Sequence, residues 1–294
     1  MTKMMSLAEA AKLIQDGQYL YIAATENCLT QLPLDNWIGG TIPYFMTPIG
    51  GMVSHDQALV TVLPQQITRC AIMSYNEAKL SSIPKNYFSN GLSLIIIPAF
   101  SQVHLKYAKE CTTWSGIFNQ PLVGWITGID LTKGTDIPKV INGMTGELST
   151  EKALVMHLDF STDIVVSANI INIFEQDKTK DSITFKNTGF ETDTALINGQ
   201  EVQLGQYLED NAVDLKRPLV ADYMGAMINV SFRDIDPQTK KVRFYAPVFP
   251  DVTYKLAKPF DNYEKQFEQA LKSHQIKDPL FACNCILNFL YANL

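Results

Sequence analysis

The end of the chain constrains the fold more than any other segment. The apolar run Phe281–Leu294 carries two cysteines, Cys283 and Cys285, and amides that include Asn284. Chain ends that fray in solvent are normally polar, so this run predicts an end that is tied into the core. Its polar atoms then need partners inside the protein. We therefore expect residues 281–290 to form an interior strand that brings its thiols and amides against the first half of the chain.

Charge and hydropathy exclude several classes of partner. The 24 Lys and Arg residues are outnumbered by 30 Asp and Glu, and the formal net charge is -6. Proteins that bind nucleic acid concentrate basic residues, so nucleic acid is not expected as a partner. The first residues lack the apolar core of a signal peptide, and no apolar stretch is long enough to span a bilayer. These features predict a soluble cytoplasmic protein that does not bind a membrane. Export by a route that reads a folded or C-terminal signal stays open.

The five cysteines do not indicate a disulfide framework or a metal site. Cys28, Cys70 and Cys111 are far apart in sequence, which is typical of reduced thiols in a cytosolic protein. The Cys283-Asn284-Cys285 motif has two thiolates at C-x-C spacing, but no nearby pair of Cys or His could complete a tetrahedral site. We expect no metal and no cofactor.

The segment from residue 92 to residue 129 predicts an α/β layer. The run Leu92–Ile97 is apolar and β-branched, as in a central strand that is buried on both faces. Ser101 is a candidate N-cap for a helix over Gln102–Cys111, and Pro121–Ile129 is a second strand. A strand, a helix and a strand in this order are typical of a parallel sheet that is covered by a helix.

The first fifty-six residues predict a helix, a strand and a long loop. Ser6 and Glu9 have the spacing of a capping box, so a helix should begin there and end at Gly17. A strand over Tyr19–Ala24 follows. Asn27–Asp56 is rich in Gly, Pro and aromatic residues but too apolar for a disordered linker. We expect a long structured loop beside a site.

Several further elements follow from periodicity and turn residues. The segments Ala58–Leu63 and Thr68–Ser74 are predicted to form a hairpin, and Ile164–Phe174 a long strand. A second hairpin should turn at Asp236–Thr239, and Asn262–Ser273 has the pattern of an amphipathic helix. The second half is therefore expected to be β-rich with few helices.

The predicted fold class is α/β in the broad sense, a mixed α+β protein with two β-rich lobes and covering helices. Composition shifts near Phe160, which places the predicted lobes at residues 1–160 and 161–294. Clefts between lobes are common ligand sites, so the pocket is expected between the two halves.

Ser101 and His104 are candidate ligand contacts. A Ser at the start of a helix, just beyond a buried strand, is where α/β folds hold anions on exposed N–H groups. A plain N-cap explains Ser101 as well and is the commoner role. His104 lies one turn further and could act as a general base, although a packed histidine is the commoner role. Ser101 lacks the Gly-x-Ser-x-Gly elbow of a hydrolase nucleophile.

Asp222 lies in a segment, Pro218–Asn229, that has no other charge. A carboxylate in such surroundings is costly to bury without a partner. It is either an exposed turn residue or a recognition group for an amine, and the turn is the commoner role. Tyr223 and Trp125 could supply apolar walls, and Gly124 could make room for a ligand.

Several short motifs together resemble the FIST sensory-domain family. They are Pro121–Gly128, Ile141–Gly143, Lys152–Met156, Ser182–Leu208, Pro250–Leu256 and Phe281–Cys283, in the order in which that family has its own. Where the family's closing signature has Gly and Arg, this chain has Cys285 and Ile286. The resemblance identifies the chain as a divergent member. It implies a FIST-like architecture and a sensory module for small molecules such as amino acids, with a signalling protein as a partner.

The predicted function is thus non-catalytic binding of an amino-acid-like or carboxylate-like molecule. The expected pocket residues are Ser101, His104, Gly124, Trp125, Asn142, Asp222, Tyr223, Cys283 and Asn284. In this prediction the N–H groups at Ser101 hold a carboxylate and Asp222 holds an amine.

Two alternatives stay open. One is an enzyme that uses Cys283 or Cys285 as nucleophile and His104 as base. The other is an interaction protein or effector, whose mark would be an exposed apolar patch over Trp37–Met46.

Overall fold

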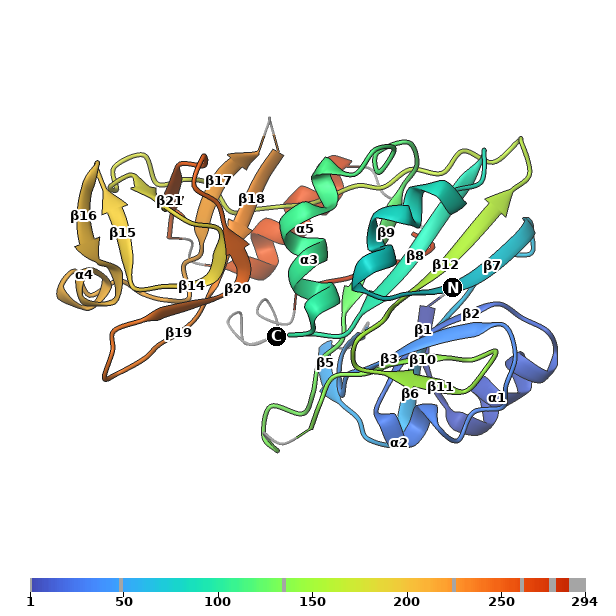
Figure 1. The fold of residues 1–294 in the computed structure, drawn as a ribbon. Coiled ribbons are helices and arrows are strands. Elements are labelled where there is room, and N and C mark those ends of the chain that lie inside the picture. Colours follow the sequence, from blue (N-terminus) through green and yellow to red (C-terminus); the bar gives the residue numbers. More distant parts are fainter. Residues whose placement is uncertain are drawn as a thin grey trace. The chain divides into compact units, whose positions relative to one another are not determined.

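The computed structural model describes residues 2–47, 50–133, 136–223, 226–259, 262–274 and 279–285. It is a mixed α/β protein of two compact units (Figure 1). Unit 1 comprises Met1–Asn169 with Ile276–Leu294, and unit 2 comprises Ile170–Gln275. The sequence predicted one boundary near Phe160 and assigned everything after it to the second lobe. The chain instead returns to unit 1 at its end, because Phe281 packs edge-to-face on Tyr21, with ring centroids 5.3 Å apart.

The first sheet of unit 1 has six strands. In spatial order they are β1 (Thr2–Ser6), β6 (Gln57–Val62), β2 (Leu20–Ala24), β3 (Trp37–Thr41), β10 (Val140–Asn142) and β11 (Glu147–Ser149). The neighbours β2 and β3 are parallel, while the other neighbouring pairs are antiparallel. The short helix α2 (Glu26–Leu29) follows β2 directly. The carboxyl ends of β2 and β3 therefore lie at the same edge of the sheet.

Helix α1 (Leu7–Gln15) begins where the sequence predicted it. The backbone N–H of Ser6 donates to Glu9 Oε2 at 2.9 Å, and the Glu9 N–H donates back to Ser6 Oγ at 3.3 Å. This is the predicted capping box. The chain leaves the helix through Gly17, whose φ of 75° lies in the left-handed region that favours glycine.

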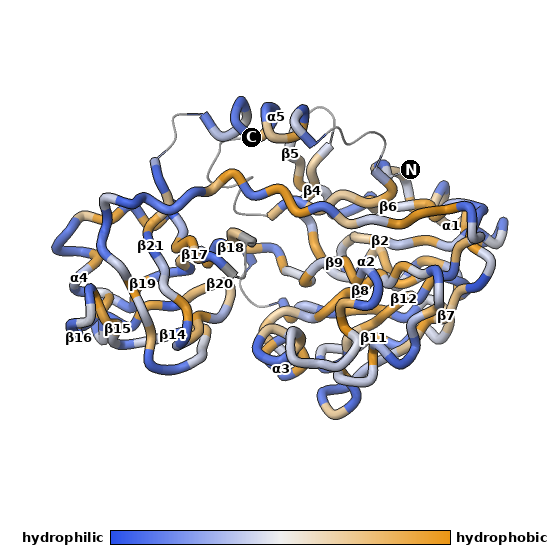
Figure 2. Tube along the Cα trace, turned by 90° about the horizontal axis from the view of Figure 1, so that it is seen from above, coloured by the Kyte–Doolittle hydropathy of each residue, from blue (hydrophilic) through white to orange (hydrophobic). Residues whose placement is uncertain are grey.

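The second sheet of unit 1 contains the predicted α/β layer. Its order is β7 (Ile67–Tyr75), β12 (Ala153–Phe160), β8 (Gly91–Ile97) and β9 (Leu122–Ile126). Every residue of β8 and β12 is buried, and both strands are hydrophobic along most of their length (Figure 2). The chain passes from β8 through α3 (Gln102–Glu110) to β9, which pairs with β8 in parallel. The predicted strand–helix–strand unit is thus confirmed.

The predicted hairpin of residues 58–74 is wrong. Strand β6 pairs with β1 and β2, whereas β7 pairs with β12 in the other sheet. Two consecutive apolar strands can each find a better partner elsewhere, and local sequence does not reveal which. Residues 77–86 form a 3-10 helix, η1 (Glu77–Asn86).

The long segment Asn27–Asp56 is mostly regular structure rather than a loop. It contains β3 and a two-stranded ribbon, β4 (Tyr44–Thr47) with β5 (Gly50–Val53). Trp37 and Ile38 are completely buried, and Phe45 is 4% exposed. A contiguous exposed apolar patch over Trp37–Met46 is therefore excluded, and the interaction-protein alternative loses the observation on which it depended.

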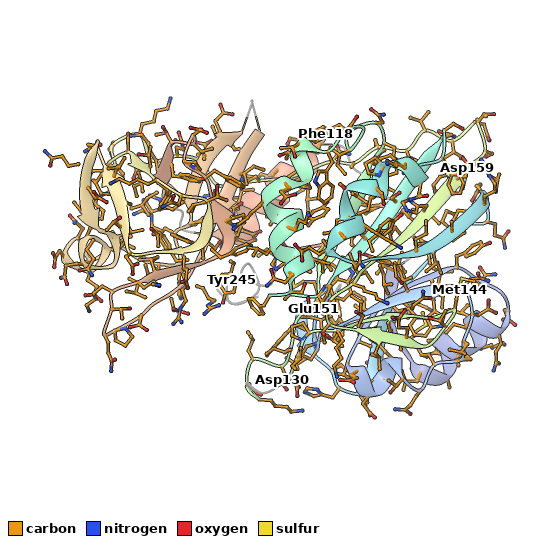
Figure 3. All side chains as sticks on the ribbon, in the orientation of Figure 1. Phe118, Asp130, Met144, Glu151, Asp159 and Tyr245 are labelled. Atoms are coloured by element: carbon orange, nitrogen blue, oxygen red, sulfur yellow. The ribbon has the colours of Figure 1, made fainter. Side chains whose placement is uncertain are left out.

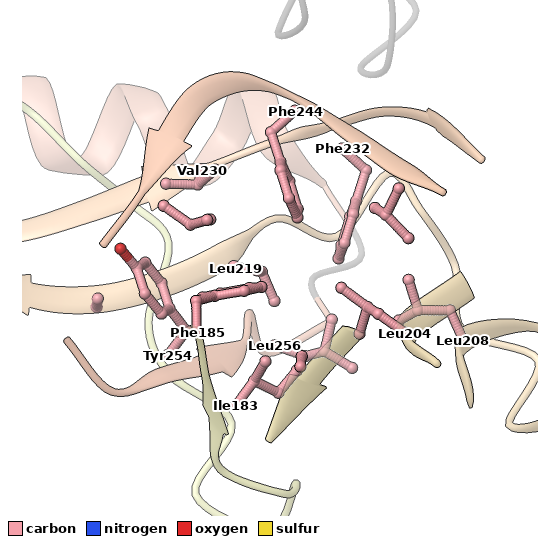
Figure 4. Close-up of a cluster of buried hydrophobic side chains, with 14 of the residues drawn as sticks. Ile183, Phe185, Leu204, Leu208, Leu219, Val230, Phe232, Phe244, Tyr254 and Leu256 are labelled. Atoms are coloured by element: carbon pink, nitrogen blue, oxygen red, sulfur yellow. The ribbon is translucent and has the colours of Figure 1, made fainter. Parts of the chain in front are cut away.

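Unit 2 is β-rich, as predicted. One sheet has the order β16 (Gln200–Gln203), β15 (Thr194–Ile197), β13 (Ile183–Thr184), β21 (Tyr254–Leu256), β17 (Leu219–Tyr223) and β18 (Ala226–Val230). The other has β14 (Gly189–Thr192), β20 (Val242–Val248) and β19 (Phe232–Ile235). Side chains from both sheets, with α4 (Leu204–Asp210), form one hydrophobic core (Figure 4). Strands β19 and β20 form the predicted hairpin at residues 236–239, and α5 (Tyr263–His274) is the predicted helix.

The predicted strand over residues 164–174 is absent from this described segment. Val165 is 91% exposed and Ile170 is 78% exposed, so its apolar residues are not all buried. The Asn90 carboxamide donates to the carbonyls of Ser161 at 2.8 Å and Ile164 at 3.1 Å, where a strand would need a neighbour. One polar side chain thus satisfies the carbonyl at the start of the predicted strand. Among the described helices, none has the length and hydropathy needed to cross a membrane.

Candidate functional site

The C-terminal segment does not form the predicted interior strand in its described part. Residues 279–285 have no regular secondary structure, and Cys283 and Cys285 are solvent-exposed residues. Phe281 is the anchor, through its contact with Tyr21. In the described part, Leu280 and Phe281 pack against the hydrophobic core of unit 1 without forming a strand. Residues 286–290 lie outside the described residues.

Ser101 is the N-cap of α3. Its hydroxyl accepts from the His104 N–H at 3.1 Å and donates to the Pro98 carbonyl at 2.7 Å. His104 is half-buried, its Nδ1 accepts from the Phe100 N–H at 3.2 Å, and burial lowers its pKa to about 4. Both residues therefore fulfil the structural roles that the sequence analysis weighed against ligand contact.

Gly124 and Trp125 pack between strands. A Cβ at Gly124 would lie 1.8 Å from the Ile95 carbonyl oxygen, so close pairing of β9 with β8 explains this glycine. Trp125 is half-buried and meets Tyr21 edge-to-face, with ring centroids 6.5 Å apart. Asn142 is 7% exposed, and its Oδ1 accepts from the Met144 N–H at 3.0 Å in the turn between β10 and β11.

The remaining predicted contacts fall in different parts of the chain. Asp222 is exposed, as expected for a turn residue, but it lies in strand β17 of unit 2 rather than in a turn. The side chain of Tyr223, also in unit 2, lies outside the described set. Asn284 is a half-buried residue of unit 1. Ser101 and Asp222, predicted to hold the two ends of one ligand, thus belong to separate units, and their joint role stays a prediction.

A buried polar network, which no local sequence pattern indicates, crosses the second sheet. Ser93 and His157 face each other on β8 and β12 and are completely buried. Ser93 Oγ lies 2.7 Å from His157 Nδ1, and the Tyr75 hydroxyl lies 2.8 Å from His157 Nε2. Gln120 donates to Ser93 at 2.7 Å, and Asn86 donates to Tyr75 at 2.9 Å. A serine next to a histidine resembles part of a catalytic triad, but no substrate can reach a fully buried pair.

The assignment that uses each hydrogen of this network once keeps His157 neutral. Ser93 accepts from Gln120 and donates to His157 Nδ1, so the imidazole hydrogen is on Nε2 and is donated to Tyr75. The Tyr75 hydroxyl then donates to Met73 Sδ at 3.3 Å. Burial lowers the pKa of His157 to about 4 and raises that of Tyr75 to about 12, so both stay uncharged near pH 7.

A pocket of about 560 Å³ in unit 1 is the better candidate site. It opens at the carboxyl ends of β2, β3 and β9, the edge where α/β folds hold ligands. The N–H of Gly128, two residues after β9, donates to the carbonyl of Thr41, the last residue of β3, at 2.7 Å. This bond joins the ends of the two sheets. The lining residues are Thr25, Glu26, Asn27, Thr30, Thr41, Ile42, Pro43, His55, Gly128, Ile129, Asp130, Lys133, Asp136 and Ile137.

Asp130 is the most constrained charge of this pocket (Figure 3). Its Oδ1 accepts from the hydroxyl of Thr132 at 2.6 Å and from the N–H of the same residue at 2.9 Å. Its Oδ2 lies 3.5 Å from His55 Nε2 and 3.7 Å from Lys133 Nζ. The Thr132 hydrogen bonds, with smaller contributions from Lys133 and His55, hold the pKa of Asp130 below its ordinary value. The carboxylate is therefore ionised at neutral pH and lies within ion-pair distance of both basic groups.

A second ion pair stands beside the pocket. Lys139 Nζ lies 2.7 Å from both carboxylate oxygens of Glu26, the first residue of α2. The Lys139 N–H donates to the hydroxyl of Thr41 at 2.9 Å, which links this pair to the end of β3. Opposite charges thus stand around a cavity large enough for a small molecule. Among the residues that the structure describes, no three His, Cys, Asp or Glu side chains are grouped so that they could hold a metal ion.

None of the nine predicted contact residues lines this pocket. Two sequence signals did point toward it. The segment 27–56 was predicted to lie beside a site, and it supplies Asn27, Thr30 and His55. The motif Asp130-Leu131-Thr132, just after a strand, is typical of a turn in which an aspartate is fixed by the residue two positions on. The approach of His55 to Asp130, seventy-five positions apart, leaves no local signal.

Comparison with known proteins identifies a family but no function. The model of a family of unknown function, DUF6976, matches residues 5–294. No curated protein and no solved structure matches the chain.

Proposed function

We propose that this chain, which belongs to the family of unknown function DUF6976, is a non-catalytic binding protein for a small amino-acid-like molecule. The ligand would occupy the pocket at the carboxyl ends of β2, β3 and β9. The observation that carries the proposal is the grouping of acidic and basic side chains there. Asp130, held by Thr132, lies near His55 and Lys133, while Asp136 lines the same cavity. A zwitterion could place an amine and a carboxylate among these groups.

The state of the candidate nucleophiles favours binding over catalysis. A catalytic thiol needs a lowered pKa and a basic partner. The Cys283 residue is exposed as a whole, but desolvation of its sulfur atom, together with the neighbouring Cys285, raises the pKa of the thiol to about 11 rather than lowering it. The serine that contacts a histidine, Ser93, is completely buried. If the resemblance to FIST domains reflects shared function, a signalling protein would respond to the occupied state.

The proposal can be tested by ligand binding to the full chain. The twenty amino acids and small carboxylates would be screened by thermal shift, and each hit would be measured by isothermal titration calorimetry. A ligand at a hundred times its Kd stabilises the native state by about 2.7 kcal/mol, which a thermal shift detects. Absence of any hit at millimolar concentration would contradict the proposal.

A steric variant locates the site. Asn27 is an exposed lining residue on α2, and Asn27→Trp should fill the cavity and abolish binding without unfolding the protein. Gln31, also exposed, lies one turn further and does not line the pocket, so Gln31→Trp is the matched control. Equal binding by both variants would place the ligand elsewhere.

A further inference from the structure

The three threonines that line the pocket already use their hydroxyl hydrogens. Thr25 donates to the His55 carbonyl at 3.3 Å, and Thr41 donates to the Gly128 carbonyl at 3.0 Å. Thr30 donates to the Glu26 carbonyl at 3.0 Å. A hydroxyl has one hydrogen, so these groups can only accept hydrogen bonds from a ligand, and Thr41, which already accepts from the Lys139 N–H, has a single acceptor position left. A threonine hydroxyl can ordinarily donate a hydrogen bond to a ligand or accept one from it. Because these hydroxyls can only accept, they favour a ligand that is rich in hydrogen-bond donors.

The charges of the pocket have the same bias. Three lining residues are carboxylates, Glu26, Asp130 and Asp136, whereas Lys133 is the single lysine in the lining. Lys133 is paired with Asp130, and Glu26 is paired with Lys139 from outside the lining. Asp136 has neither an ion pair nor a hydrogen bond from its side chain to any described residue. Apart from His55, the charged groups here are Glu26, Asp130, Asp136, Lys133 and Lys139, and together they leave one negative charge unbalanced.

We infer that the group recognised in this pocket is a protonated primary amine, and that a ligand's carboxylate contributes less. The amine would bind at Asp136 and complete its three donors on threonine oxygens, because an ammonium group has three donors and no acceptor. Lys133 and His55 are less suited to hold a carboxylate, since Asp130 already balances the lysine. This inference rests on the proposed function and specifies which end of the ligand selects the site.

Three compounds with the same three-carbon skeleton distinguish recognition of the ligand's amine from recognition of its carboxylate. They are propylamine, propionate and β-alanine, which carries both groups. Binding to the full chain would be measured by calorimetry or by ligand-detected NMR. Propylamine should bind within about tenfold of β-alanine, and propionate at least about tenfold more weakly than propylamine. Propionate binding as tightly as propylamine would overturn the inference while leaving the proposed function intact. If none of the three binds and the wider screen is also empty, both fall together.

Two variants test the assignment to Asp136. Asp136→Asn should weaken propylamine by about tenfold or more, while propionate binding stays the same or improves. Asp16→Asn removes an exposed carboxylate at the C-cap of α1, outside the pocket, and should change neither affinity. Lys133→Met should leave propylamine bound as well as before or better, since it removes the lining lysine. A loss of propylamine binding in Lys133→Met, or its persistence in Asp136→Asn, would show that the amine is not recognised here.

Discussion

Two histidines of unit 1 stand in opposite environments. His157 is completely buried and contacts the hydroxyls of Ser93 and Tyr75, while the side chain of His55 is 49% exposed and lies near the carboxylate of Asp130. The first set resembles a catalytic centre in its residue types, yet the hydrogens of Ser93, His157 and Tyr75 are all donated within the protein and these three residues are buried. The second has less familiar chemistry but adjoins an open cavity. Accessibility to a ligand, rather than residue types, distinguishes a site from a structural network.

The largest effect should come from removing the imidazole of the buried network. His157→Ala leaves a cavity and deprives Ser93 and Tyr75 of partners. The free energy of unfolding should fall by about 3–5 kcal/mol, measured by denaturant titration. His274 is an exposed histidine on α5, and His274→Ala should change the same quantity by less than about 0.5 kcal/mol. Similar losses in the two variants would refute the role assigned to the network.

Acidification should weaken the fold through the same residue. Burial lowers the pKa of His157 from 6.5 to about 4, so the unfolded chain binds a proton at a higher pH than the native protein does. The contribution of His157 to stability is therefore complete above pH 6.5 and is lost as the pH falls toward 4. The loss should reach about 3 kcal/mol.

Denaturant titrations between pH 7 and pH 4 would measure this loss, with His157→Gln as the comparison. The pH dependence should be smaller in the variant, because Gln does not titrate. His104→Gln gives an independent reference, since burial also lowers the pKa of His104 to about 4. An unchanged slope in His157→Gln would show that this imidazole does not titrate between pH 6.5 and 4.

A smaller effect is expected when one hydroxyl of the network is removed. Ser93→Ala takes away one partner of His157 and one of Gln120 but keeps the packing of β8. The free energy of unfolding should fall by about 1–3 kcal/mol, because two buried polar groups lose their hydrogen bonds. Ser81, an exposed residue of η1, provides the control Ser81→Ala. No difference between the two variants would mean that the Ser93 hydroxyl contributes little.

The smallest effect on stability should come from the pocket. Glu26→Gln breaks the ion pair with Lys139. The Glu26 side chain is 44% exposed and the Lys139 side chain is 27% exposed. Such pairs contribute less than about 1 kcal/mol to the free energy of unfolding. The same variant should alter ligand affinity, since Glu26 lines the cavity. A stability loss as large as that of His157→Ala would indicate that these charges hold the fold together rather than form a site.

Local sequence patterns predicted correctly those elements whose formation depends on residues that are close in sequence. The capping box of Ser6 and Glu9, the buried strand β8 and the helix after Ser101 need only contacts within a few positions or a continuous apolar run. The hairpin of residues 58–74 failed because β6 and β7 each pair with a distant strand. The candidate pocket was found only in part for the same reason, since Asp130, His55 and Glu26 come from three separated segments.

By itself, the sequence determined the fold class and the parallel unit from β8 to β9. Hydrophobic periodicity and capping residues specify such features because they act over one element at a time. Only the tertiary structure decided that the terminal cysteines are exposed, that His157 is enclosed and that Asp130 meets His55. Those outcomes depend on which strands pair and which loops converge, and many alternatives of similar local energy exist until the whole core is packed.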